Sequence, residues 1–408
     1  MTIEIDRVGS FHLPGREATV SGIPPREDVL TPGGPVRVID QNGTYEVEQI
    51  YVQYVRLAAP RARYPLLMWH GGGMTGVTWE DTPDGRPGWQ MAFLEFGHDV
   101  YVSDAVERGR ASFSPLPGVY GGEPFVRTKQ ECWEGFRVGP VGSWHEDRDK
   151  CRAYDGQRFP VDAFDGFVRQ TVPRWTVNDA ATQAAYDTLI QEVGPAVVMS
   201  HSQSGNFGFT AALHAPDKVR AVIGIEPSGT PLPDQVDVST VRDIPHLVVW
   251  GDFIEEGTRW PGYQQRIKAY RDALRAAGGS LDIIDLPARG IHGNSHFPMM
   301  DDNSDAVAAL VQDWIESKGL MKRPPLNTSI PAPARPGRRT RHSGKPRTMA
   351  ATSTSRRAPE LRRKISTAMK TRCGATVRLC ACRRPRRQHW APVGRHSLPR
   401  IGTGFRFT

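Results

Sequence analysis

Apolar residues form two kinds of segment that alternate along this chain. Short and almost continuous apolar runs are typical of strands buried on both faces of a parallel sheet, and they occupy residues 65–69, 99–103, 196–200, 219–225, 246–250 and 281–286. Apolar residues spaced three and four positions apart indicate helices over residues 89–96, 179–193, 206–214, 263–277 and 305–317. The alternation predicts an α/β fold, with a mostly parallel central sheet and helices on both of its faces.

Two regions depart from this alternation. Residues 7–55 alternate apolar and polar positions in short stretches separated by Pro and Gly, which predicts leading antiparallel strands. Residues 108–175 are rich in Gly and Pro but also hold nine Phe and Trp residues, an aromatic content that argues against disorder. We expect a cap or insertion whose aromatic side chains line an apolar substrate pocket. An extra packing layer without substrate contact is the alternative.

Charge divides the chain near residue 321. Residues 322–408 hold 23 Lys and Arg against one acidic residue, Glu360, so their formal net charge is +22. Residues 1–321 hold 29 basic and 43 acidic residues, a net charge of −14. The overall charge of +8 therefore combines an acidic foldable domain, residues 1–320, with a basic tail, residues 321–408.

The composition of the tail is that of a segment that cannot fold alone. Ala, Pro, Arg, Ser and Thr dominate it and the hydrophobic periodicity is lost, so we expect residues 321–408 to be disordered. A basic tail can bind nucleic acid through phosphate contacts, but few aromatic residues could stack on bases and no nucleic-acid module is recognisable. We favour an extension without a selected function, such as the translation of another frame of a GC-rich gene.

The sequence predicts neither a membrane span nor a secretory signal. Its longest apolar runs are a handful of residues, whereas a span needs about 20. The chain begins MTIEIDRVGSF, with acidic residues among the first six and no apolar segment, so a cytoplasmic location is expected. The five cysteines show no CxxC pair and no zinc-ligand spacing. We therefore expect no metal or cofactor, and we interpret Cys132 and Cys151 as free thiols rather than a disulfide.

The sharpest motif is a serine between small residues at the end of a buried strand. Residues 197–205 read VVMSHSQSG and place Ser202 in the turn between a predicted strand and a predicted helix. A nucleophile elbow has this form, because the turn strains the central serine and lifts its hydroxyl above the sheet. The usual pattern is G-x-S-x-G, and small residues, Ser200 and Ser204, replace both glycines here. Ser202 is the candidate nucleophile, and an ordinary serine-rich loop is the alternative.

A glycine-rich turn follows the strand predicted at residues 65–69. Residues 70–73 read HGGG, and consecutive glycines let backbone N–H groups approach a ligand oxygen closely. Hydrolases with a nucleophile elbow place half of their oxyanion hole at such a turn. We therefore expect the N–H groups of Gln203, on the elbow, and of Gly72 or Gly73 to bind a developing oxyanion.

The general base has two candidates. When the chain order is serine, acid, histidine, the base follows the last strand of the sheet. Residues 290–297 read GIHGNSHF at that place and offer His292 and His296. The other two nearby histidines, His70 and His201, lie inside the glycine-rich turn and the elbow, where we expect them to shape the backbone rather than to move protons.

The acid that orients the imidazole also has two candidates. Glu226 directly follows the strand predicted at residues 219–225, and Asp252 follows the next strand. The position of Asp252 is the commoner one for the acid in this arrangement. Spacing alone does not decide between them.

Taken in their order, these motifs are those of an α/β-hydrolase, and residues 1–320 resemble the bacterial esterase family typified by the Alcaligenes esterase. The matching stretches are GSFHLPGR at residues 9–16, HGGGMTGVTWE at 70–80, TPDG at 82–85, SHSQSG at 200–205, IEP at 225–227 and GNSH at 293–296. The resemblance implies Glu226 as the acid, because the family's acid follows the sixth strand. It implies His296 as the base, because the family's histidine lies in the GNSH segment.

The chain departs from that family in two respects. The type enzyme has adjacent cysteines where this chain has Gly72 and Gly73, so a redox or conformational role of such a pair is not expected here. Family members are often exported, and the missing signal is the second departure.

The sequence thus predicts a serine carboxylesterase that hydrolyses small to medium esters through Ser202, His296 and Glu226 and an acyl-enzyme. A thioesterase, lactonase, amidase or carbon–carbon hydrolase on the same triad stays open, as does a non-catalytic binding protein with a nucleic-acid-binding tail. The expected partner is a small-molecule ester. No membrane partner is expected, nucleic acid is expected only through the tail, and formation of a homo-oligomer is left open.

Overall fold

The structure is a computed structural model of the 408-residue chain, and it describes residues 2–322. All but the first two residues of the predicted basic tail, with Cys373, Cys380 and Cys382, lie outside the described residues. The prediction of a disordered tail is therefore not addressed by the structure.

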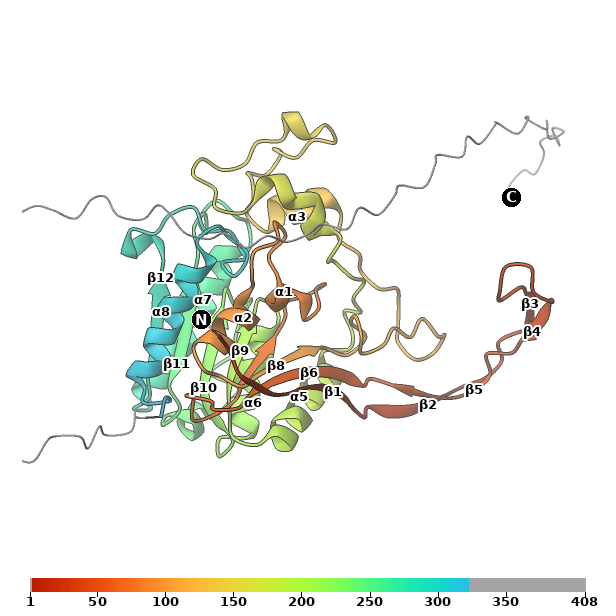
Figure 1. Ribbon diagram of the computed structural model, residues 1–408, viewed down its shortest axis with the longest axis horizontal. Coiled ribbons are helices and arrows are strands. Elements are labelled where there is room, and N and C mark those ends of the chain that lie inside the picture. The colour runs from red at the N-terminus through yellow and green to blue at the C-terminus, as the bar shows by residue number, and fades with distance from the viewer. Residues whose placement is uncertain (1, 323–408) are drawn as a thin grey trace, which may run out of the picture. The chain divides into compact units, whose positions relative to one another are not determined.

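An eight-stranded sheet forms the centre of the described part (Figure 1). Its strands lie in the order β1-β6-β8-β7-β9-β10-β11-β12. The strands from β8 to β12 run parallel, while β6 pairs antiparallel with both β8 and β1. The bounds are β1 Ile5–Leu13, β6 Ile50–Leu57, β7 Leu66–Trp69, β8 Val100–Asp104, β9 Ala196–His201, β10 Val219–Ile225, β11 His246–Trp250 and β12 Leu281–Asp285. This confirms the predicted mostly parallel sheet.

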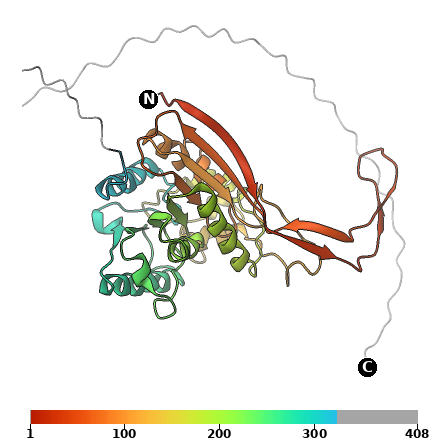
Figure 2. The ribbon, with the colours of Figure 1, turned by 90° about the horizontal axis from the view of Figure 1, so that it is seen from below.

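Helices cover both faces of the sheet (Figures 1 and 2). Side chains of three helices pack against one face, namely α1 Val77–Glu80, α2 Trp89–Glu95 and α8 Ser304–Ser317. Side chains of three others pack against the opposite face, namely α5 Asp179–Val193, α6 Ser204–His214 and α7 Trp260–Ala276. Two single-turn 3₁₀ helices, η3 Val238–Val241 and η4 Pro287–Arg289, lie in the connections next to β11 and β12.

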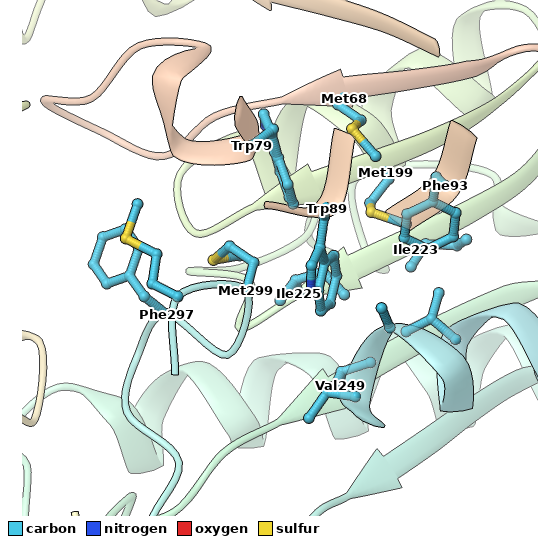
Figure 3. Close-up of a cluster of buried hydrophobic side chains, with 14 of the residues drawn as sticks. Met68, Trp79, Trp89, Phe93, Met199, Ile223, Ile225, Val249, Phe297 and Met299 are labelled. Atoms are coloured by element: carbon cyan, nitrogen blue, oxygen red, sulfur yellow. The ribbon is translucent and has the colours of Figure 1, made fainter. Parts of the chain in front are cut away.

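The central strands are apolar throughout because both of their faces are buried. In β7 the side chain of Met68 joins the α2/α8 core, and its neighbour Leu67 joins the core beneath α5, α6 and α7. The alternation follows from the pleat, which sends successive side chains to opposite faces. Figure 3 shows the first core, where Met68 and Met199 lie near Phe93 and Trp89 of α2.

A narrow β ribbon extends from the edge of the sheet at β1 and β6 (Figures 1 and 2). It consists of the antiparallel pair β2 Arg16–Val20 with β5 Gly43–Val47, followed by the pair β3 Arg26–Asp28 with β4 Arg37–Ile39. These strands, with β1 and β6, are the antiparallel strands predicted for residues 7–55, so that prediction is confirmed.

The segment 108–175 connects β8 to the loop before α5 and contains only short helices. They are α3 Lys129–Gly135, α4 Phe164–Val168, η1 Arg148–Lys150 and η2 Val161–Ala163. Of the nine Phe and Trp side chains in the segment, Phe136 alone lines the pocket described below, so the expected aromatic lining is wrong for the other eight. Five of the nine are buried in the α2/α8 core, in edge-to-face or tilted contact with one another, namely Trp133, Phe136, Phe159, Phe164 and Phe167. These buried aromatic side chains mainly anchor the segment to the core.

The predicted helices are all present, with ends that differ by three residues or fewer. The short helices α1, α3 and α4 were not predicted, because four to seven residues are too few to establish a helical period. Cys132 and Cys151 are both free, as expected. No helix within residues 2–322 is both long enough and apolar enough to cross a bilayer.

Helix α2 offers a matched test of the core. We expect Phe93→Ala to lower the free energy of unfolding by about 3–5 kcal/mol, because a fully buried ring leaves a cavity. The control is Met91→Ala on the same helix, where the side chain is 42% exposed and the change should stay within about 0.5 kcal/mol. Urea unfolding followed by circular dichroism measures both, and equal losses would contradict the assignment of the core.

Candidate active site

The predicted functional residues all follow the carboxyl ends of parallel strands. Ser202 follows β9, Glu226 follows β10, and the segment with His296 follows β12 and η4. The glycine-rich turn, residues 70–73, follows β7, which lies beside β9 in the sheet. Because parallel strands end at the same edge of a sheet, segments far apart in sequence meet there.

Ser202 has the strained backbone of a nucleophile elbow. Its φ is +53°, a left-handed conformation that costs energy for a non-glycine residue. The N–H of Ser202 donates to the carbonyl of Ile225 at 3.1 Å, which fixes the turn against the end of β10. The serines that replace the usual glycines have partners, since Ser200 Oγ donates to Ile223 O and Ser204 Oγ to His70 O.

His296 and Glu226 form a fully buried pair. His296 Nδ1 lies 3.2 Å from Glu226 Oε2, and both side chains have no exposed surface. Since a carboxylate accepts, this contact places the proton on Nδ1 and leaves Nε2 free to accept. Within the described residues, Nε2 has no hydrogen-bond partner. The ring lies between Phe136 and Trp260, at centroid distances of 5.5 and 4.2 Å.

Glu226 is held by groups from two other segments. Arg137 Nη2, from the loop after α3, donates to Oε1 at 2.8 Å, and the N–H of Gly251, at the end of β11, donates to the same oxygen. Burial raises the pKa of Glu226, while the Arg137 charge opposes that rise. Arg137 also donates to Asp252 O at 2.7 Å and lies 4.5 Å from the Trp260 ring centroid.

His296 is surrounded by positive charge as well as by apolar groups. Burial lowers its pKa well below the usual range, and His201, Arg137, Arg259 and Arg127 lower it further. The imidazole is therefore neutral at pH 7, the state in which Nε2 can accept a proton.

The loop that carries His296 is fixed by a buried carboxyl group. Asp301 accepts from the N–H and the hydroxyl of Ser295 at 2.9 and 2.7 Å, and from Asn294 Nδ2 at 2.9 Å. Burial raises the pKa of Asp301 to about 7. The GNSH segment thus has a structural reason for its Asn and Ser, independent of any substrate.

The second candidates for acid and base are next to each other rather than next to Ser202. Asp252 Oδ2 lies 3.4 Å from His292 Nδ1, and His292 is 68% exposed. Asp252 also accepts from the N–H groups of Phe253 and Gly293, both at 2.8 Å. Neither residue lines the pocket that contains Ser202 and His296.

His70 and His201 hold backbone together. His70 Nδ1 bonds to Gly71 O at 2.8 Å while its Nε2 accepts from Ala105 N at 3.0 Å. His201 Nε2 bonds to the carbonyl of His296 at 2.9 Å and so ties the elbow to the histidine loop. Burial lowers the pKa of His70 to about 4 and that of His201 to about 3.

Ser202 and His296 share a pocket of about 210 Å³. Gly72 and Gln203, two of the residues expected to bind an oxyanion, line the same pocket. Ser202 Oγ is hydrogen-bonded to Ser228 Oγ at 3.2 Å, and no hydrogen bond joins it to His296 among the described residues.

Several residues of the site were not predicted from the sequence. Ser228 could have been found, since it lies two residues beyond Glu226. No spacing signals the arginines of the site. Arg127, Arg137 and Arg174 come from the 108–175 segment, and Arg259 directly precedes α7.

The glycine-rich turn makes room for a side chain of the 108–175 segment. A Cβ on Gly72 would overlap Arg174 Nη1 and lie 2.7 Å from Gln203 Oε1, two atoms that are hydrogen-bonded at 2.9 Å. Gly73 has a φ of +75°, and its carbonyl accepts from Val172 N at 2.9 Å. Glycine at position 72 therefore permits Arg174 to lie against the turn.

The comparisons with known proteins agree with this fold. One solved structure, the atomic resolution structure of a novel bacterial esterase, has 35% sequence identity and a TM-score of 0.67. The match covers 78% of this chain and 98% of that chain. This chain belongs to the bacterial esterase family of α/β-hydrolases. This chain, called the esterase from here on, is thus a hydrolase that acts on carboxylic esters. No protein-family model matches it.

A curated relative of the esterase corrects one expectation. The probable secreted lipase phiG of a fungal species is 27% identical over 335 residues, which covers 68% of this chain and 88% of that protein. Its description as secreted contradicts the predicted cytoplasmic location and points to an extracellular one. The prediction rested on the first residues alone, and targeting segments are independent of the fold that the rest of a chain encodes.

A substitution at the glycine-rich turn tests its role in the esterase. We expect Gly72→Ala to lower kcat/KM for p-nitrophenyl butyrate about tenfold or more, because the new methyl group displaces Arg174 and the Gln203 side chain beside Ser202. Gly121→Ala is the control, since its Cβ would meet nothing within 4 Å. Unchanged kinetics for Gly72→Ala, with a normal circular dichroism spectrum, would contradict this account.

Proposed function

We propose that the esterase is a serine carboxylesterase for small carboxylic esters, with Ser202 as nucleophile, His296 as base and Glu226 as the acid that orients His296. The observation that carries the proposal is the buried His296–Glu226 pair. His296 lines the same pocket as Ser202, and its Nε2 has no hydrogen-bond partner among the described residues. A histidine with Nδ1 bound to a carboxylate and Nε2 free beside a strained serine is the arrangement that acyl transfer requires.

The reaction would begin with a proton transfer from Ser202 to His296. Ser202 Oγ leaves Ser228 and turns toward Nε2, which takes its proton as Oγ attacks the ester carbonyl. Glu226 holds the tautomer and stabilises the imidazolium that forms. His296 then protonates the leaving alcohol, and the acyl group stays on Ser202.

Hydrolysis of the acyl-enzyme would use the same groups. Water gives a proton to His296 and attacks the acyl carbonyl. His296 then returns the proton to Ser202 Oγ as the carboxylic acid product leaves. In both steps the N–H groups of Gln203 and of Gly72 or Gly73 would stabilise the tetrahedral oxyanion. Removal of one such donor typically costs on the order of 3 kcal/mol.

The volume of the pocket supports a small substrate. At about 210 Å³ it is smaller than the roughly 300–1,000 Å³ of pockets that enclose drug-sized ligands. A short acyl or alcohol group would fit beside Ser202, and a long chain would extend beyond the pocket.

Ser202→Ala tests the nucleophile. We expect hydrolysis of p-nitrophenyl butyrate to fall by at least about 1,000-fold, since no acyl-enzyme can form. Ser317→Ala, at an exposed position on α8, is the control and should keep full activity. Mass spectrometry of the wild type quenched during turnover should show a butyryl adduct on Ser202. Full activity of Ser202→Ala would rule out the proposed mechanism.

The choice of acid is tested by a pair of isosteric variants. We expect Glu226→Gln to lower kcat by at least about 100-fold, because a glutamine NH₂ toward Nδ1 favours the wrong tautomer of His296. Asp252→Asn should change kcat by less than about threefold, since Asp252 contacts His292 and two backbone N–H groups at a distance from the pocket. The reverse pattern of losses would assign the role to Asp252.

A further inference from the structure

Three arginines line the pocket that holds Ser202. Arg127 and Arg174 come from the 108–175 segment, and Arg259 directly precedes α7. The one carboxylate among the lining residues is Asp179, which accepts from Gln203 Nε2 at 2.9 Å. A pocket for a neutral apolar ester needs no such excess of positive charge.

The three guanidinium groups are only partly compensated. Arg127 forms an ion pair with Glu131. Among the described residues, Arg174 and Arg259 have no carboxylate within ion-pair distance, and the contacts of their terminal nitrogens are uncharged, with Gln203 Oε1 at 2.9 Å and Gly135 O at 2.8 Å. Burial and the neighbouring arginine lower the pKa of Arg259 and of Arg127. Each guanidinium offers five donors, so both Arg174 and Arg259 keep donors for a ligand.

Backbone and aromatic groups hold these arginines at the pocket. Each lies against a glycine where a Cβ would crowd it, because a Cβ on Gly135 would lie 2.6 Å from Arg259 Nη2 and one on Gly73 would lie 3.3 Å from Arg127 Nε. A Cβ on Gly72 would likewise crowd Arg174 Nη1. Arg259 also lies 5.3 Å from the Trp260 ring centroid.

Antiparallel backbone pairing adds to this support. Phe125 N donates to Arg174 O at 2.7 Å and Arg174 N to Phe125 O at 3.0 Å. Two parts of the 108–175 segment are thereby joined next to the pocket, with Arg174 in the pair and Arg127 two residues after Phe125.

We propose that the esterase is specific for esters that carry a second, non-reacting carboxylate, which Arg174 and Arg259 bind beside Ser202. The inference rests on the proposed function, because it names the substrate class of the same site. Arginine suits a carboxylate because its planar donors match both oxygens. An anion in the pocket would also reduce the repulsion between the arginines and the imidazolium that forms on His296.

The test compares esters that differ only in charge. For the acyl side we use the mono-p-nitrophenyl ester of adipic acid and its neutral carboxamide analogue. For the alcohol side we use 4-acetoxybenzoate and 4-acetoxybenzamide. Every kcat/KM is divided by the spontaneous hydrolysis rate of the same ester, which corrects for intrinsic reactivity. The full chain is used throughout.

We expect the carboxylate ester of at least one pair to be preferred by about tenfold or more, the range of a charge-assisted hydrogen bond. Arg259→Gln should reduce that preference to about threefold or less, and Arg259→Lys should keep part of it because the charge remains. Arg275→Gln is the control, since Arg275 is an exposed arginine at the other end of α7, and it should leave the preference unchanged.

The outcomes separate this inference from the proposed function. If the neutral esters are hydrolysed with full dependence on Ser202 but neither carboxylate ester is preferred, the inference is wrong and the triad stands. A preference that persists in Arg259→Gln and in Arg174→Gln would also overturn it. If Ser202→Ala hydrolyses the neutral esters as fast as the wild type, the proposed function itself fails.

Discussion

The buried ion pair between Arg137 and Glu226 is the interaction on which the rest of the site depends. A carboxylate with no exposed surface is costly to charge, and a cation with hydrogen bonds must compensate for the lost water. Arg137 supplies the positive charge and a hydrogen bond to Glu226. Its second contact, with the carbonyl of Asp252, attaches the 108–175 segment to the end of β11. With Glu226 charged, Nδ1 of His296 keeps its proton and Nε2 remains an acceptor. Loss of this one guanidinium would therefore affect Glu226 and His296, the proposed acid and base, and the docking of the 108–175 segment.

The 108–175 segment has two roles, and mostly different residue types perform them. Five of its aromatic side chains pack into the α2/α8 core and fix the segment in place, and one of these, Phe136, also lines the Ser202 pocket. Its arginines reach the Ser202 pocket and the Glu226 carboxylate. The glycines of the turn at residues 70–73 belong to the same arrangement, because the absence of a side chain at Gly72 is what admits Arg174. In this esterase the turn thus provides space for a charged side chain, besides the backbone N–H groups that are proposed to bind the oxyanion.

Buried histidines connect the parts of the site without being its reacting groups. His70 joins the glycine-rich turn to the end of β8, and His201 joins the elbow to the loop of His296. Both are neutral because burial lowers their pKa values. A neutral imidazole can donate from one nitrogen and accept at the other. His70 uses both nitrogens, with Gly71 O and Ala105 N, whereas His201 uses only Nε2 among the described residues. Asp301 likewise holds backbone in place, because it accepts from the N–H and the hydroxyl of Ser295 in the loop that carries His296.

The sequence by itself determined the strands, the longer helices and the order of the chemical motifs, because burial on two faces and helical periodicity are local properties of a chain. The elbow, the glycine-rich turn and the GNSH segment were found for the same reason, each being a short stretch with a strong backbone requirement. Only the tertiary structure decided which residues meet. Spacing could not rank Glu226 against Asp252 or His296 against His292, whereas the fold brings each acid next to a different histidine. The arginines of the pocket could not be predicted either, since they come from the 108–175 segment and from the residue before α7. A basic residue in a loop has no local signature of the carboxylate or the cavity that it will face.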